Sequence, residues 1–238
     1  MQSVAAWAAT RGYEYKFLDD ALFERVPTWF RDKVGGNLLP MSDLARLKIA
    51  RELLDDGFDR AIWLDADVLV FDPDGFEIAV ETAYAFGREV WVRRGGGDTL
   101  LATEGLHNAV CVFCRDNDFL NFYIHASEEI VRGAPSEVLS HQIGPDFLNR
   151  LSDVIGPRVV PDVGLFSPLV ITDIAGGGGR ALTMHMDAFG HPVRAANLCL
   201  SFVGRESSGV TVTDAILNRA IDRLLGTLGR ELGQTAVE

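Results

Sequence analysis

Residues 61–73 read Ala-Ile-Trp-Leu-Asp-Ala-Asp-Val-Leu-Val-Phe-Asp-Pro, and this stretch decides the fold class. Its apolar run 61–64 ends in two carboxylates, Asp65 and Asp67, before a second apolar run, 68–71. Apolar runs of this length between turn residues are typical of buried strands, on which charge is rare unless it is paired or binds a metal. The two acids therefore predict a strand end that presents oxygen ligands to a hard divalent cation, with an exposed turn as the structural alternative.

Helix and strand signals alternate around this stretch. Ser42 or Asp43 is expected to cap an amphipathic helix that runs to about Asp55, and Gly57 ends it before the strand 61–64. This order predicts an α/β domain with a mixed, mostly parallel sheet flanked by helices. We also expect helices at 3–10, 116–132, 145–151 and 214–232, strands at 13–17, 84–86, 90–92, 109–114, 159–160 and 169–171, and loops at 93–98 and 175–180.

The overall charge and hydropathy exclude several classes of function. The chain has 238 residues, of which 47% are hydrophobic, and a net charge of −12. That charge argues against nonspecific binding to nucleic acid or anionic lipid, because both reward clustered Lys and Arg. No apolar stretch approaches the roughly 20 residues of a transmembrane helix, and residues 1–7 lack the basic start of a signal peptide.

The cysteines point to a reducing compartment. There are three of them, an odd and sparse number for a disulfide scaffold. Cys111 and Cys114 have CxxC spacing, but they lie in an apolar run without a second pair, which favours a buried strand over a redox or zinc role. We therefore expect a cytoplasmic protein that is not transmembrane.

Two segments, one before the paired acids and one that ends in them, carry a family likeness. They read Ser-Asp-Leu-Ala-Arg-Leu-Lys at 42–48 and Gly-Phe-Asp-Arg-Ala-Ile-Trp-Leu-Asp-Ala-Asp at 57–67. Together they resemble the nucleotide-sugar glycosyltransferases of the GT-A fold, above all the retaining bacterial sugar transferases with a DxD strand. The resemblance covers about residues 7–150. It implies a single Rossmann-like GT-A domain with a nucleotide-sugar half, 1–115, and an acceptor half that includes the C-terminal helix, 116–238.

The resemblance implies metal-dependent transfer of a sugar from a nucleotide sugar, a UDP-sugar first, to a glycan or lipid-linked acceptor. Such a reaction serves surface polysaccharide or glycoconjugate synthesis. Negative charge grows on the departing diphosphate, and a bridging Mn²⁺ or Mg²⁺ stabilises it. In retaining enzymes of this kind the leaving phosphate can itself help to deprotonate the acceptor, so no dedicated base is assigned from the sequence.

The resemblance also assigns roles to four charged residues. Asp67 would ligate the metal directly and Asp65 would touch the ribose or a metal-bound water, so that the two form the catalytic pair. Asp43 and Arg46 lie one helical turn apart and would contact the donor sugar or phosphate. The plain structural alternatives are a helix cap for Asp43 and an ordinary solvated face for Arg46.

Further site residues come from later segments. Gly144 and Pro145, counted with the donor-binding residues, resemble a loop that lines the acceptor side. The position where relatives place a histidine as third metal ligand corresponds to Asn197. His185 and His191 are other candidates, although a lone His is more often structural. An Asn carbonyl ligates a cation more weakly than a His or a carboxylate.

The chain departs from the family pattern at its start, and two rival functions stay open. It begins in what would be the first helix of a GT-A domain, so we expect a sheet that lacks the first strand or replaces it. One rival is a non-catalytic GT-A-like partner of another transferase, which would bind nucleotide without turnover. The other is a haloacid-dehalogenase-like phosphatase with Asp65 as nucleophile, but that class needs a later lysine and the last one is Lys48.

Overall fold

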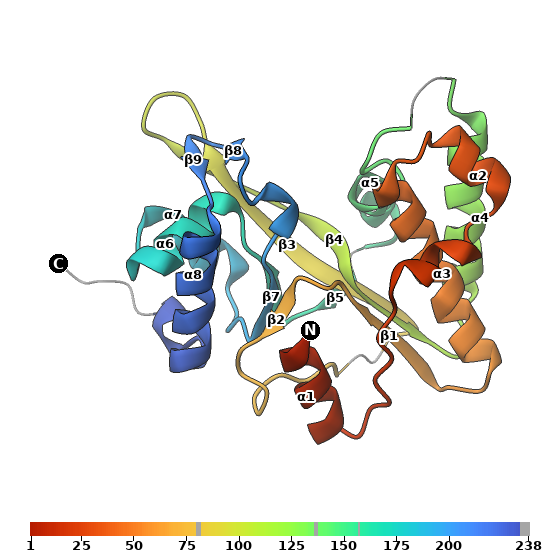
Figure 1. Cartoon of the computed structure of the whole chain (residues 1–238), viewed down its shortest axis with the longest axis horizontal. Coiled ribbons are helices and arrows are strands. Elements are labelled where there is room, and N and C mark those ends of the chain that lie inside the picture. The colour runs from red at the N-terminus through yellow and green to blue at the C-terminus, as the bar shows by residue number, and fades with distance from the viewer. Residues whose placement is uncertain (80–81, 136–137, 157, 234–238) are drawn as a thin grey trace.

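The computed structural model describes the chain except at residues 80–81, 136–137, 157 and 234–238. The fold is mixed α/β, and a long hairpin formed by β3 (Tyr84–Arg94) and β4 (Leu100–Cys114) runs through the molecule (Figure 1). Helices α2–α5 gather at one end of this hairpin, and helices α6–α8 gather at the other. The hairpin therefore connects two groups of helices.

The remaining elements have the following bounds. The helices are α1 (Gln2–Thr10), α2 (Thr28–Lys33), α3 (Leu38–Asp55), α4 (Asp118–Gly133), α5 (Pro145–Ile155), α6 (Pro168–Gly176), α7 (Arg180–Phe189) and α8 (Asp214–Thr227). Short 3₁₀ turns are η1 (Asp20–Arg25), η2 (Leu200–Phe202) and η3 (Arg230–Gly233). The other strands are β1 (Arg60–Leu64), β2 (Val68–Val70), β5 (Val159–Val160), β6 (Val163–Leu165), β7 (Ala195–Asn197), β8 (Glu206–Ser207) and β9 (Val210–Thr211).

The strands form two main sheets and a small ribbon. Their orders are β1-β4-β3-β5, β2-β7-β6 and β8-β9. The pairs β3–β5 and β6–β7 are parallel, whereas β1–β4, β3–β4, β2–β7 and β8–β9 are antiparallel. The mixed sheet is confirmed, but the expectation of mostly parallel pairing is wrong for the described strands. The reason is the β3–β4 hairpin, whose short turn forces its two long strands to run in opposite directions.

The two predicted acids lie where the chain passes from one main sheet to the other. β1 belongs to the first sheet and β2 to the second, and a tight turn at 65–67 joins them. The Asp65 N–H donates to the carbonyl of Ala109 at 2.8 Å, and the Leu198 N–H donates to the carbonyl of Asp67 at 3.0 Å. The acids are therefore on a turn rather than on a regular strand, and this turn is hydrogen bonded to both sheets.

Several predicted elements are confirmed. The strand before the acids is β1, and the helix capped by Asn117 is α4, in which the Asn117 side chain accepts from the Leu120 N–H. The two short strands expected at 84–86 and 90–92 are one strand, β3, with an irregularity in its register at Phe86 and Gly87. Among the described strands β1 pairs with β4 alone, so β1 is an edge strand.

Three element predictions are wrong. Residues 169–171 lie in the helix α6 rather than in a strand, because Pro168 supplies a preset first helical turn. Helix α3 begins at Leu38 with Asn37 as its N-cap, so Asp43 lies inside the helix and is not a cap. Residues 13–17 form no strand, and the ammonium of Lys16 lies over the Phe58 ring instead.

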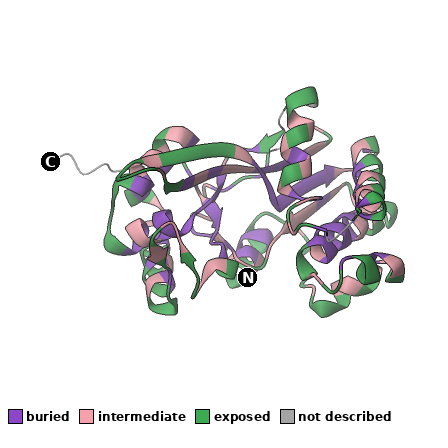
Figure 2. Cartoon of the chain, turned by 90° about the horizontal axis from the view of Figure 1, so that it is seen from above, coloured by how far each residue is buried: buried purple, intermediate pink, exposed green. Residues whose placement is uncertain are grey.

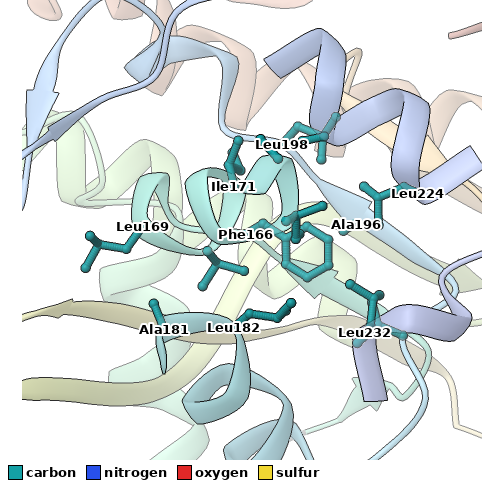
Figure 3. Packing of buried hydrophobic residues seen from close by; sticks show 14 of the residues in the cluster. Phe166, Leu169, Ile171, Ala181, Leu182, Ala196, Leu198, Leu224 and Leu232 are labelled. Atoms are coloured by element: carbon teal, nitrogen blue, oxygen red, sulfur yellow. The ribbon is translucent and has the colours of Figure 1, made fainter. Parts of the chain in front are cut away.

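The core of the described residues consists of four clusters, and all four contain residues from both predicted halves of the chain. Figure 3 shows the largest cluster, where α6, α7 and α8 pack against strands, and Figure 2 shows the exposed tip of the long hairpin. Leu47 of α3, Phe113 of β4 and Leu120 of α4 share a second cluster. Residues on both sides of position 115 therefore share one core. No helix in the described part of the chain is long and apolar enough to cross a membrane.

Candidate functional site

The site begins with a buried arginine held between two carboxylates. Asp43 and Arg46 lie one turn apart on α3 and are 6% and 4% exposed. The Arg46 guanidinium lies 3.2 Å from Asp43 Oδ1 and 3.1 Å from Asp65 Oδ1. The interpretation of Arg46 as part of a solvated face is therefore wrong, because a charge this buried is stable only with partners of opposite sign.

Arg46 makes three further hydrogen bonds. Its Nε and Nη2 donate to the carbonyl and hydroxyl oxygens of Ser42, and its Nη1 donates to the carbonyl of Asn108. Its guanidinium also lies 5.3 Å from the Trp63 ring centroid. With the two ion pairs, these bonds engage all three nitrogens of the guanidinium. Arg46 thus positions the acids, and a donor phosphate would have to compete with these contacts for it.

The charge state of this group follows from its burial and its neighbours. Burial alone would lower the pKa of the Arg46 guanidinium, but the charges of Asp65 and Asp43 outweigh it and raise that pKa. Burial raises the pKa of the Asp43 carboxyl, although Arg46 and the Asn108 amide counteract it. The arginine is therefore charged throughout the physiological range, and the Asp43 carboxyl takes up a proton at a higher pH than it would in water.

Gly144, which the resemblance placed at the site, lies against this group. A Cβ at Gly144 would lie 2.7 Å from Asp43 Oδ2 and 3.0 Å from Asn108 Nδ2, so only glycine allows the backbone to approach this closely. Pro145 follows as the first residue of α5 and fixes the start of that helix at the site. Residues 43 and 144 thus meet although 100 positions separate them.

Asn108 is a site residue that the sequence analysis missed. Its Nδ2 donates to Asp43 Oδ1 at 2.7 Å, and its carbonyl accepts from Arg46. It lies on β4, directly before the run that was predicted as a buried strand. The pair His107 and Asn108 interrupts an apolar stretch just as Asp65 and Asp67 do, and this shared pattern is the signal that could have identified it.

The second acid, Asp67, lies in a separate but adjoining group. Asn197 Nδ2 donates to Asp67 Oδ1 at 2.6 Å, and the Leu200 N–H donates to Asp67 Oδ2 at 3.1 Å. Asp65 accepts from Trp63 Nε1 at 2.6 Å and is half-buried. Burial first, and then the charge of Asp65, raise the pKa of the Asp67 carboxyl. The two carboxylates therefore repel one another across the turn.

Two candidates for a third metal ligand, Asn197 and His185, lie in different places. Asn197 ends β7 beside Asp67, where the sequence placed it. His185 lies in α7 with its Nδ1 3.0 Å from the Val90 carbonyl and its ring stacked on Phe189, and burial lowers its pKa to about 4. These contacts place His185 in the core rather than with the acids. Among the described residues no group of three His, Cys, Asp or Glu side chains is arranged to hold a metal ion.

A polar cavity of about 610 Å³ lies elsewhere, at the end of α3. Arg51, Gly57, Arg115 and Asn117 line it, and none of the predicted site residues does. Its lining mixes both signs of charge and includes no group that the predicted chemistry uses. The candidate site is therefore the region around the 65–67 turn.

Comparison with protein-family models, with curated proteins and with solved structures gives no match. The functional argument consequently rests on the residues and their geometry. Asp43, Arg46, Asp65 and Gly144 form one group of contacts, and Asp67 adjoins it through the turn. His185 is the predicted site residue that lies apart from both groups.

Proposed function

We propose that this protein transfers a sugar from a nucleotide sugar, a UDP-sugar first, to a glycan or lipid-linked acceptor with the help of Mn²⁺ or Mg²⁺. One observation carries the proposal: residues picked from distant segments by their family likeness lie together. Asp43 and Arg46 come from α3, Asp65 from the end of β1 and Gly144 from the start of α5. If each of these residues had only a structural role, their segments would not need to meet at one pair of acids.

The donor set at the turn fits a hard divalent cation. Asp65 and Asp67 repel one another in a half-buried place, and a cation between them would relieve that repulsion. Mg²⁺ is commonly bound by one or two carboxylates together with substrate phosphates, so a third acidic ligand is not required. Asn197 turns its NH2 group toward Asp67 and its amide oxygen toward the Cys199 N–H, so in this arrangement it would orient Asp67 rather than ligate the cation. When bound, such a cation would stabilise the charge on the departing diphosphate.

The chain's own residues would orient the donor around that cation. Arg46 forms an ion pair with both Asp43 and Asp65 and so would hold the two carboxylates beside one another. The Asp43 Oδ2 atom faces the Gly144 backbone, where there is no side chain. Asp43 is buried against this backbone, so Asp65, whose side chain is 26% exposed, would be the carboxylate that a sugar hydroxyl meets.

The test is a thermal-shift panel of UDP, GDP, CDP and dTDP, each with and without Mn²⁺. A ligand at about 100 times its Kd should add roughly 2.7 kcal/mol to the free energy of unfolding. We expect a shift for one nucleotide that requires Mn²⁺ and is lost in Asp67→Asn. The matched control is Asp59→Asn, because Asp59 is a 95% exposed acid at the other end of β1.

Each outcome decides between the functions. A metal-dependent shift with release of diphosphate from the sugar nucleotide supports a transferase. A metal-dependent shift without any release favours the non-catalytic binding partner. A shift that Asp67→Asn leaves unchanged places the nucleotide away from the turn and overturns the site. The absence of a shift with every nucleotide overturns the donor proposal itself.

A further inference from the structure

An unpaired glutamate faces the same region from the long hairpin. On β3, Val90 and Val92 point into the largest core cluster, and Arg88 on the same side bonds to the carbonyl of Phe189. Because side chains alternate along a strand, Glu89 and Trp91 point to the opposite side. Glu89 is half-buried there, and the described residues give it neither a hydrogen bond nor an ion pair.

The face that carries Glu89 leads directly to the acids of the turn. Trp91, two residues along β3, packs against Phe202 with 5.3 Å between the ring centroids. Phe202 ends η2, and Leu200 at the start of η2 donates its N–H to Asp67 Oδ2. A chain of contacts thus connects the Glu89 face of the strand to the carboxylate assigned to the metal.

Cys199 connects η2 to the second acid of the turn. Its buried side chain lies between Asn197 and η2, and its backbone N–H donates to the Asn197 amide oxygen at 2.8 Å. The backbone before η2 is therefore held by the same side chain that donates to Asp67.

The surroundings of Glu89 suit proton transfer. Opposite it on β4 stands Gly105, and the Asn149 side chain packs against that glycine while its amide bonds to the Leu106 backbone rather than to Glu89. The titratable group on that side of β4 is His107, whose pKa burial lowers to about 3, so it is neutral at physiological pH. Burial alone raises the pKa of Glu89 to about 7. A general base acts best when its pKa is near the working pH.

We propose that Glu89 is the catalytic base that accepts the proton of the acceptor hydroxyl, an inference that rests on the proposed transferase function. The acceptor oxygen forms the new bond to the anomeric carbon as its O–H bond breaks, and the proton passes to the Glu89 carboxylate. The bond from the anomeric carbon to the diphosphate breaks, and its electron pair leaves with the nucleoside diphosphate. Glu89 then returns the proton to water.

The test compares Glu89→Gln with Glu104→Gln. Glu104 is a matched control because it is an exposed glutamate on the same hairpin whose carboxylate binds Arg88 on the other side. The substrates are UDP-glucose, UDP-galactose, UDP-N-acetylglucosamine and GDP-mannose with Mn²⁺, with water as the acceptor and release of nucleoside diphosphate as the readout. We expect Glu89→Gln to lower release at least about 100-fold, and Glu104→Gln to leave it within twofold of the parent.

A pH profile separates a base from a residue that only supports the fold. In the parent the rate should rise with pH through an apparent pKa near 7, because only the ionised Glu89 accepts a proton. Glu89→Gln should lose this rise, and Glu89→Asp should restore part of it. If Glu89→Gln lowers the rate equally at every pH and leaves the shape of the profile unchanged, the proposal that Glu89 is the base is overturned.

Nucleotide binding keeps the two proposals distinguishable. Glu89→Gln should retain the Mn²⁺-dependent thermal shift of the parent, because Glu89 does not contact the donor acids directly. Normal binding with unchanged release in Glu89→Gln overturns the base and leaves the donor site intact. Normal binding in the parent with no release from any of the four substrates also counts against the base. The loss of all binding in the parent removes both proposals.

Discussion

Arg46 offers the sharpest test of how the site is built. Replacing it with methionine would keep much of the side chain's volume but leave Asp43 and Asp65 without their shared cation. Breaking a buried ion pair by removing one partner costs about 3–5 kcal/mol, because the remaining charge stays buried. In a chain of 238 residues each kcal/mol lowers Tm by about 2–4 °C, so the expected loss is roughly 6–20 °C.

The assay is urea unfolding at pH 7 with a matched control on the same helix. Arg51→Met removes an exposed arginine that pairs with Asp55 one turn away, and such pairs contribute about 0.3–0.5 kcal/mol. Adding Asp43→Asn and Asp65→Asn to Arg46→Met should recover much of the loss, since no buried charge then remains unpaired. A cost below about 0.5 kcal/mol for Arg46→Met would refute this reasoning and return Arg46 to the surface role considered from the sequence.

Three further predictions use other features. Gly144→Ala should destabilise the protein and weaken nucleotide binding, because its Cβ would press on Asp43. The control Gly133→Ala has open space around the new Cβ and should do neither. Urea unfolding measures the stability of both variants, and thermal shifts measure their nucleotide binding. Asn117→Ala should cost about 1 kcal/mol in urea unfolding through loss of the helix cap, and an unchanged midpoint would contradict that role. The raised pKa of Glu89 means that the folded state binds its proton more tightly than the unfolded state, so stability from this group is present below about pH 4.5 and is lost as pH rises through about 7. Glu89→Gln should therefore unfold at higher urea than the parent at pH 8 but not at pH 4, and equal gains at both pH values would exclude this linkage.

The sequence located the acids because local patterns there agree with the fold. An apolar run, two acids and a second apolar run predicted β1 and the two acids that follow it, and the resemblance picked out Asn197, which contacts Asp67. The helix α4 was predictable because Asn117 is a strong cap before a clear apolar periodicity. In each case the decisive residues are neighbours in the chain.

Failures arose where tertiary contacts decide the outcome. Val170 and Ile171 are β-branched and suggested a strand, but α6 is buried on most of its surface and so shows no amphipathic pattern. A solvated face stayed open as the alternative for Arg46 because its partner Asp65 comes from another element, so the sequence could not show that Arg46 is buried. Glu89 gave no signal at all, since its unpaired, half-buried state depends on how the hairpin packs against η2.

The pairing of β4 with β1 and β3 fixes the distance between Asp65 and Glu89. Asp65 meets β4 at Ala109 and Glu89 meets it at Gly105, so four residues of one strand separate the two positions. The register shift opposite Phe86 and Gly87 falls within this stretch, so the backbone spacing is shorter than the roughly 13 Å of a regular strand at about 3.3 Å per residue. The strand and its irregularity, not a loop, thus set the length of ligand that can touch both groups. Side-chain substitutions would alter which ligand atoms are recognised. A change in the length of ligand that fits would require a new strand register, and a one-residue shift of register would also turn the Glu89 side chain into the core.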